Sequence, residues 1–107
     1  RYFQYMVALI EKHRNELIDL CRKFKVKRLE LFGSATGNHF DPVKSDVDFL
    51  VEFEPSIPKE HASCYFGLLQ ALQELLARNV DLVEFGAIRN PYFKKEIEPL
   101  RERLYGK

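Results

Sequence analysis

The sequence predicts a small α/β (α+β) protein in which helices flank a mixed three-stranded sheet. Three short apolar segments, at about 27–32, 46–54 and 79–85, have the length and composition of strands. Two longer segments, at about 3–24 and 60–78, repeat apolar residues at helical spacing. Together these patterns predict a small sheet with helices packed on it.

The first helix leads into the first strand through a basic turn. One face of the helix at 3–24 carries the apolar side chains Phe3, Val7, Ile10, Leu17, Leu20 and Phe24. The strand at 27–32 ends at Gly33-Ser34, and a short helix or loop with turn residues is expected before the next strand.

The second strand, at 46–54, is predicted to have one apolar face and one acidic face. Residues i and i+2 of a strand project to the same face. The apolar face holds Val47, Phe49, Val51 and Phe53, and the other face holds Asp46, Asp48, Leu50 and Glu52. After a proline-containing break, the helix at 60–78 carries the apolar stripe Tyr65, Leu68, Leu69, Leu72, Leu75 and Leu76.

The end of the chain is predicted to be helical. Asn90 is a favourable N-cap, and Pro91 stands at the first helical position, where proline is preferred. Pro99 falls inside the pattern and is expected to kink or split this helix, because proline lacks the backbone N–H.

The expected topology follows from bringing the acidic residues to Gly33. The first strand must end where the second begins, so these two strands are antiparallel. Asp81 lies near the start of the third strand, which therefore runs parallel to the second. The helix at 60–78 is long enough for that crossover, and the expected strand order is 1-2-3.

Asp46 and Asp48 are the clearest functional signal in the sequence. They share a strand face roughly 7 Å apart, and carboxylates that close repel unless a positive charge lies between them. Mg²⁺ prefers such oxygen ligands and keeps substrate phosphates in its shell. With Asp81, three carboxylates could hold two metal ions for an in-line displacement at phosphorus. The turn at Gly33-Ser34 can approach a phosphate closely and donate amide hydrogen bonds to it.

Each of these signals also has a simpler structural explanation. The paired acids could be solvated residues at a strand start, the third acid a turn or capping residue, and the glycine turn an ordinary strand-to-helix connection. Their combination at strand ends favours the functional interpretation. Elsewhere, Glu52 and Glu84 are expected to be peripheral or ion-paired, and His39 is expected to be a solvated loop histidine.

Three motifs lie on or beside the predicted strands: Leu31-Phe32-Gly33-Ser34, Ser45-Asp46-Val47-Asp48-Phe49-Leu50-Val51 and Val80-Asp81-Leu82-Val83. Together they resemble the minimal nucleotidyltransferases (MNT) of the polymerase-beta superfamily, and the resemblance covers nearly the whole chain. It implies the polymerase-beta-like nucleotidyltransferase fold, with catalytic and metal-binding roles for Asp46, Asp48 and Asp81. It implies two Mg²⁺ ions, and ATP as the substrate bound at Gly33 and Ser34. It also implies a partner, because MNT proteins of this size commonly accompany a small helical HEPN-domain toxin and act as its antitoxin.

The segment after Gly33-Ser34 departs from the family pattern. Family members usually carry one or two arginines there, whereas this chain has Ala35-Thr36-Gly37-Asn38-His39. We therefore expect the triphosphate either to be held less firmly than in the family or to be held by Lys44 or another basic side chain.

Composition limits the classes of protein to which the chain can belong. With 46% hydrophobic and 31% charged residues, it is expected to fold as one globular domain, 1–107. A net charge of +1 gives the protein no overall electrostatic attraction to nucleic acid, so direct nucleic-acid binding is not expected. Cys21 and Cys64 are expected to be reduced thiols of a cytoplasmic protein. No apolar run has the length of a membrane span, and no signal peptide is recognised.

The leading hypothesis is a Mg²⁺-dependent enzyme that transfers a nucleoside monophosphate, AMP from ATP, to a hydroxyl acceptor. The resemblance implies that the acceptor is a tyrosine of the partner HEPN toxin. Two alternatives stay open at this stage. The domain could neutralise its partner by binding alone, which the altered segment after Ser34 favours and the three aspartates oppose. It could also modify a small molecule such as an aminoglycoside, which the lack of an acceptor-binding domain opposes.

Overall fold

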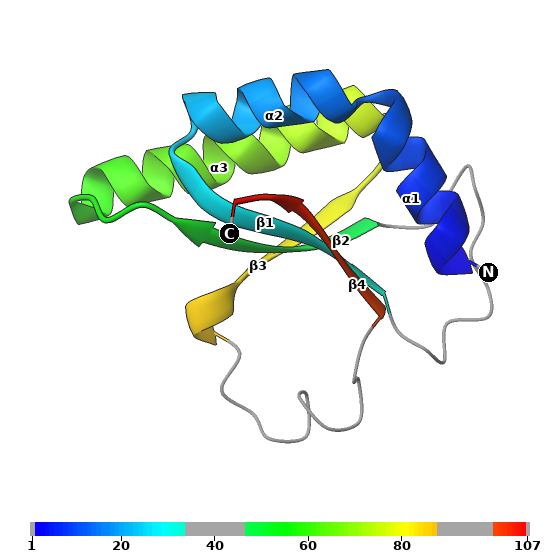
Figure 1. Cartoon of the computed structure of the whole chain (residues 1–107). Coiled ribbons are helices and arrows are strands. Elements are labelled where there is room, and N and C mark those ends of the chain that lie inside the picture. The colour runs from blue at the N-terminus through cyan, green and yellow to red at the C-terminus, as the bar shows by residue number, and fades with distance from the viewer. Residues whose placement is uncertain (1, 34–46, 88–99, 107) are drawn as a thin grey trace.

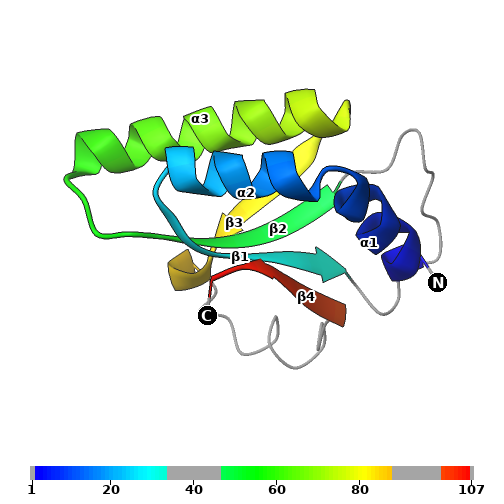
Figure 2. The same ribbon diagram turned by 45° about the horizontal axis from the view of Figure 1, so that its top comes forward.

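The computed structural model describes residues 2–33, 47–87 and 100–106, which form a four-stranded sheet with helices on one face (Figure 1). The elements are, in order, α1 (Tyr2–Lys12), α2 (Arg14–Lys23), β1 (Val26–Gly33), β2 (Val47–Phe53), α3 (Pro58–Leu76), β3 (Val80–Glu84), the short 3-10 helix η1 (Phe85–Ala87) and β4 (Leu100–Tyr105). The strand order is β3-β2-β1-β4, with β1 antiparallel to both β2 and β4, and β2 parallel to β3. Helices α2 and α3 lie side by side over one face of this sheet (Figure 2).

The first three strands form and pair as predicted, whereas the end of the chain differs from the prediction. The antiparallel β1–β2 pair and the parallel β2–β3 pair are as expected. However, β4 forms at Leu100–Tyr105, where the last helix was expected to continue, and it pairs with the far side of β1. In β4, Arg101 and Arg103 share one face of the sheet, while Leu104, which is 5% exposed, lies on the other. Successive residues of a strand project to opposite faces. The expected helix start at 90–99 lies outside the described residues.

The predicted helix at 3–24 is divided into two helices at His13. The backbone of His13 leaves the helical region (φ −117°, ψ 23°), and its N–H donates to the carbonyl of Ile10 at 2.9 Å. Ile10 from α1 and Leu17 from α2 are both fully buried. The apolar spacing did not reveal the break, because both helices direct their stripes into the same core.

The hydrophobic core lies between the sheet and helices α2 and α3. Its side chains come from alternate strand positions and from the helix stripes, as the sequence predicted. The apolar face of β2 is buried throughout, at Val47, Phe49, Val51 and Phe53. The stripe of α3 is buried at Leu68, Leu72 and Leu76 and partly buried at Tyr65, Leu69 and Leu75.

Both cysteines are free thiols, as predicted. Cys21 is fully buried, and burial raises the pKa of its thiol to about 12. The thiol therefore stays protonated and unreactive near neutral pH. Within the described ranges, no helix is long and apolar enough to cross a membrane.

The end of α3 offers a test of the backbone geometry. The C-cap Ala77 has a left-handed conformation (φ 55°, ψ 42°), which glycine adopts without the steric cost of a Cβ atom. We expect Ala77→Gly to raise the free energy of unfolding by about 0.5–1 kcal/mol, measured by urea denaturation. The matched change Ala62→Gly, at an exposed position inside α3, is expected to lower it by about 1 kcal/mol. Equal losses in the two variants would contradict this geometry.

Candidate functional site

Three of the predicted site residues meet at one edge of the sheet. Gly33 is the last residue of β1, while Asp48 and Asp81 are the second residues of β2 and β3. The pairing directions bring the end of β1 to the starts of the other two strands, on the right of Figure 1. We call Gly33, Asp48 and Asp81 the carboxylate edge. The other predicted site residues, Ser34, Lys44 and Asp46, lie outside the described part of the chain.

Asp48 and Asp81 project from the same face of the sheet. Asp48 is the register partner of Asp81 across the parallel pair and of Phe32 across the antiparallel pair. Register partners share a face, and neighbouring strands lie about 4.8 Å apart. Asp48 is half-buried and Asp81 is exposed. This is the face away from α2 and α3, and we call it the distal face: Arg28, Glu30, Phe32, Asp48, Leu50, Glu52, Asp81, Val83, Arg101 and Arg103.

Hydrogen bonds at the strand starts fix the carboxylate edge in place. The N–H of Val47 donates to the carbonyl of Asn79 at 3.2 Å, which joins the start of β2 to the residue before β3. The N–H of Val80 donates to the side-chain oxygen of Gln73 on α3 at 3.3 Å. Each bond lies one residue from an aspartate, so the backbone segments that carry Asp48 and Asp81 are joined to each other and to α3.

Tyr65 on α3 gives β3 a further anchor. Its hydroxyl donates to the carbonyl of Leu82 at 2.5 Å, next to Asp81. Burial, and then the negative charges of Glu84 and Asp81, raise the pKa of Tyr65. The hydroxyl therefore stays protonated at neutral pH and remains a donor to β3. The sequence analysis placed Tyr65 only in the apolar stripe of its helix.

The donor atoms of the carboxylate edge suit a hard cation. Asp48 and Asp81 supply carboxylate oxygens, the ligands that Mg²⁺ prefers. Among the described residues, no group of three His, Cys, Asp or Glu side chains is close enough to hold a metal ion. Mg²⁺ is usually bound through one or two carboxylates together with substrate phosphates. The described pair therefore fits Mg²⁺ bound jointly with a nucleotide.

A buried carboxylate on β1 was missed by the sequence analysis. Glu30 is 3% exposed, and its Oε1 accepts from Nε of Arg101 at 2.7 Å. Its Oε2 accepts from Arg103 at 3.4 Å. Both arginines come from β4, which was expected to be helical, so their approach to Glu30 could not be predicted. The available signal was the alternation of arginine with other residues after Pro99.

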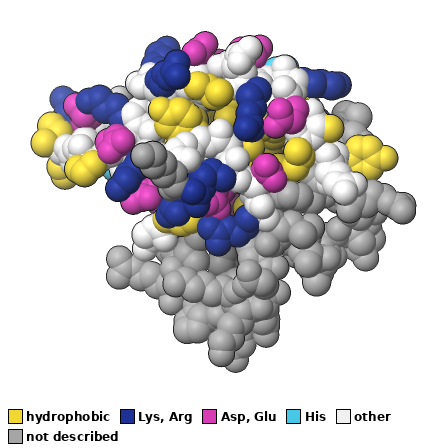
Figure 3. Space-filling view, viewed as in Figure 1, with side chains coloured by type: hydrophobic (Ala, Val, Ile, Leu, Met, Phe, Trp, Pro, Cys, Tyr) yellow, Lys and Arg dark blue, Asp and Glu magenta, His cyan; other side chains and the backbone are white. Residues whose placement is uncertain are grey.

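Glu52 and Glu84 both lie beside basic side chains, as expected. Glu52 lies 3.4 Å from Arg28 and 3.8 Å from Lys27, and Glu84 lies 2.8 Å from His61. The space-filling view shows basic and acidic side chains side by side in the same part of the surface (Figure 3). His39 lies outside the described residues.

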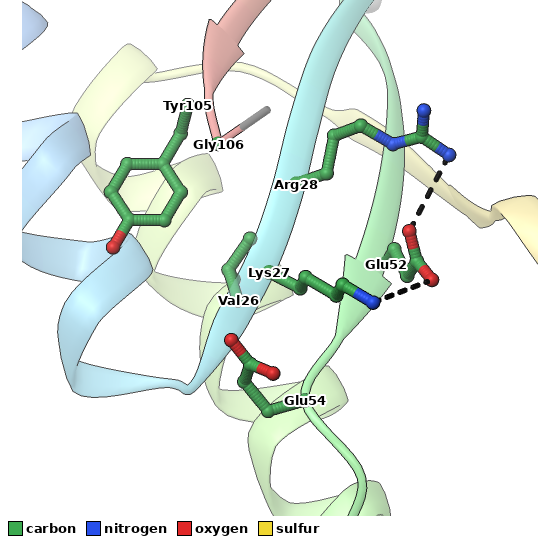
Figure 4. Close-up of a pocket in the computed structure, with 7 residues that line it drawn as sticks. All are labelled: Val26, Lys27, Arg28, Glu52, Glu54, Tyr105 and Gly106. Carbon is green, nitrogen blue, oxygen red and sulfur yellow. Dashed lines mark ion pairs between the residues drawn. The ribbon is translucent and has the colours of Figure 1, made fainter.

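A pocket lies at the opposite end of the sheet from the carboxylate edge, beside the start of β1 (Figure 4). Figure 4 shows Lys27 and Arg28 both directed at Glu52, so its carboxylate already has two cationic partners. The pocket thus has no uncompensated pair of acids for a metal ion. Its lining residues are Val26, Lys27, Arg28, Glu52, Glu54, Tyr105 and Gly106.

Comparison with known proteins agrees with this geometry. Residues 10–103 match the nucleotidyltransferase domain family. The chain belongs to this family. Two proteins of Methanocaldococcus jannaschii, each named a putative protein adenylyltransferase, are 44% and 38% identical to it over 92 residues, which are 84% of this chain and 85% of each relative.

Solved structures of other proteins share the fold of this nucleotidyltransferase. A toxin–antitoxin complex with AMP-PNP has a TM-score of 0.60 at 25% identity, with 88% of this chain and 73% of that chain covered. A complex of tri-AMPylated HEPN toxin with MNT antitoxin, from Shewanella oneidensis, has a TM-score of 0.59 at 22% identity, with 91% and 72% covered. The chain is thus a nucleotidyltransferase-domain protein with the fold of the MNT antitoxin structures, as its motifs predicted.

Proposed function

We propose that this nucleotidyltransferase transfers AMP from ATP to the hydroxyl of a tyrosine in a HEPN-domain toxin. It thereby acts as the antitoxin of that toxin. The observation that carries the proposal is the carboxylate edge, where Asp48 and Asp81 are register partners beside the end of β1 at Gly33. Relatives named as adenylyltransferases support the transferred group, and a structural neighbour that contains an AMPylated HEPN toxin supports the acceptor.

The proposed reaction is an in-line displacement at the α-phosphorus of ATP. A bond forms from the acceptor oxygen to this phosphorus, the bond to the β-phosphate bridging oxygen breaks, and pyrophosphate leaves. Asp46, Asp48 and Asp81 would hold Mg²⁺, which supplies neutralisation of phosphate charge when bound. The chain's own contribution is to position the reactants and to present fixed dipoles to the developing charge.

Individual residues would have separate roles in this reaction. The backbone at Gly33 lets the phosphates approach closely, and Ser34 would add a hydroxyl donor. Lys44 would supply a positive charge to the triphosphate. Asp81, which is exposed, would accept the proton that the acceptor hydroxyl loses.

Transfer of label from ATP tests the proposal directly. The protein is expressed with its neighbouring gene's product, purified as a complex, and incubated with α-labelled ATP and Mg²⁺. We expect label on a tyrosine of the partner, and none when γ-labelled ATP is used instead. A stable complex that never acquires label would refute transfer and leave neutralisation by binding alone. Label on an added aminoglycoside but not on the partner would identify a small-molecule enzyme.

A further inference from the structure

Strand β3, which carries Asp81, lies at the edge of the described sheet, where it pairs with β2 only. Two side chains of α3 supply further partners for its backbone. Gln73 accepts from the N–H of Val80 at 3.3 Å, and Tyr65 donates to the carbonyl of Leu82 at 2.5 Å. Residues 80 and 82 are the two neighbours of Asp81 in the chain. The backbone is therefore held from the helix on both sides of this aspartate, although an edge strand usually leaves such groups unpaired.

The ring of Tyr65 is itself held by aromatic neighbours. Its centre lies 6.5 Å from that of Phe53 and 5.2 Å from that of Phe66, and both contacts are edge-on, an arrangement that aromatic pairs favour. Burial, and then the negative charges of Glu84 and Asp81, raise the pKa of Tyr65. The hydroxyl is therefore a protonated donor in a fixed place, close enough to Asp81 to be affected by its charge.

The position of Asp81 relative to Asp48 depends on how β3 lies against β2. Strand β3 has five residues and Asp81 is the second of them, near an end where short elements open most readily. Neighbouring strands twist relative to one another, so a loosened β3 would move Asp81 away from its register partner Asp48. The bond from Tyr65 opposes this movement at the residue next to Asp81. Two carboxylates that act on one reacting centre require their separation to be kept.

We propose that Tyr65 is a positioning residue for AMP transfer: its hydroxyl, through the carbonyl of Leu82, keeps Asp81 beside Asp48 in the reactive arrangement. The inference rests on the proposed function, in which Asp81 takes part in the reaction. In this role Tyr65 touches no reactant. Its effect therefore passes through Asp81, and its loss lowers the rate of transfer more than the affinity for ATP.

Tyr65→Phe tests the proposal, because it removes the hydroxyl and keeps the ring contacts. Single turnovers of α-labelled ATP by the complex with its partner, at several ATP concentrations, are measured for wild type, Tyr65→Phe, Asp81→Asn and the double variant. We expect Tyr65→Phe to lower the maximal rate about tenfold and to change the half-saturating ATP concentration by less than about twofold. In the Asp81→Asn background, the same change is expected to alter the rate by less than about twofold, because the residue through which Tyr65 acts is already lost.

Leu104→Val is the matched control for a general loss of stability. Leu104 is 5% exposed in the core and lies on β4, at the opposite edge of the sheet from β3. We expect it to lower the melting temperature to a similar degree as Tyr65→Phe but to leave the maximal rate within about twofold of wild type. Amide hydrogen exchange of the complex gives a second readout that needs no reaction. Exchange in β3 is expected to be faster in Tyr65→Phe and unchanged in Leu104→Val.

Several results would overturn the role of Tyr65. A maximal rate of Tyr65→Phe equal to that of wild type would mean that the hydroxyl only supports β3. A tenfold loss in both backgrounds would mean that it acts without Asp81, and equal losses in Tyr65→Phe and Leu104→Val would reflect stability alone. If wild type itself transfers no AMP, the proposed function fails. Unchanged exchange at Asp81 in Tyr65→Phe would separately refute the anchoring of this residue.

Discussion

Replacing Asp48 with asparagine is expected to lower the rate of AMP transfer by at least about 100-fold, which corresponds to about 2.7 kcal/mol of transition-state stabilisation. Asparagine has the same shape but lacks the charge that would hold Mg²⁺ at the carboxylate edge. Asp48 lies near the start of β2 and is half-buried, so the backbone pairing with β1 and β3 is expected to survive. Initial rates with labelled ATP and the partner measure the effect, and the melting temperature checks the fold.

Glu52→Gln is the matched control for this variant. Glu52 lies on the same strand and the same face, but its partners are Lys27 and Arg28 at the other end of the sheet. We expect a rate within about twofold of wild type, because surface ion pairs contribute little and no reactant is placed there. Equal rates for Asp48→Asn and wild type would show that Asp48 takes no part in the reaction.

Phe49→Ala is expected to have the largest effect on stability, a loss of about 3–5 kcal/mol in the free energy of unfolding. Phe49 is fully buried in the core, and its register partners Leu31 and Leu82 are also buried. Removing its ring leaves a cavity between the sheet and the helices that the neighbours cannot fill completely. Urea denaturation of the purified chain measures the loss.

Phe66→Ala provides the comparison, since it removes the same side chain from a surface position. Phe66 is 64% exposed on α3, and its ring contacts Tyr65 edge-on at 5.2 Å. We expect a loss of less than about 1 kcal/mol. A loss as large as that of Phe49→Ala would show that the described core is not the main source of stability.

Local patterns were enough to predict the central strands but not the edge strand. The alternation from Val47 to Phe53 predicts the two faces of β2, and the assumption that its aspartates meet Gly33 and Asp81 predicted the directions of β1 and β3. In the segment Leu100–Tyr105 the apolar residues do not alternate regularly, and the N-cap and proline signals at Asn90 and Pro91 favoured a helix that extended through it. Strand formation there depends on pairing with β1, a contact distant in sequence that no local pattern reports.

The candidate site was predicted in part for the same reason. The expected topology was derived by requiring Gly33, Asp48 and Asp81 to meet, and the observed strand pairing brings them together. Glu30 and Arg101 become neighbours only when β4 pairs with β1, and an error about β4 therefore hid them. Roles for Ser34, Lys44 and Asp46 remain predictions from sequence.

The central claim is that nucleotide and metal bind together at the carboxylate edge. A crystal structure with AMP-PNP and Mn²⁺, with anomalous scattering to locate the ion, tests it most directly. We expect an anomalous peak about 2.1 Å from a carboxylate oxygen of Asp48, with the phosphates beside Gly33. A peak in the pocket beside Glu52 and Glu54, or a nucleotide bound away from Asp48 and Asp81, would contradict the claim.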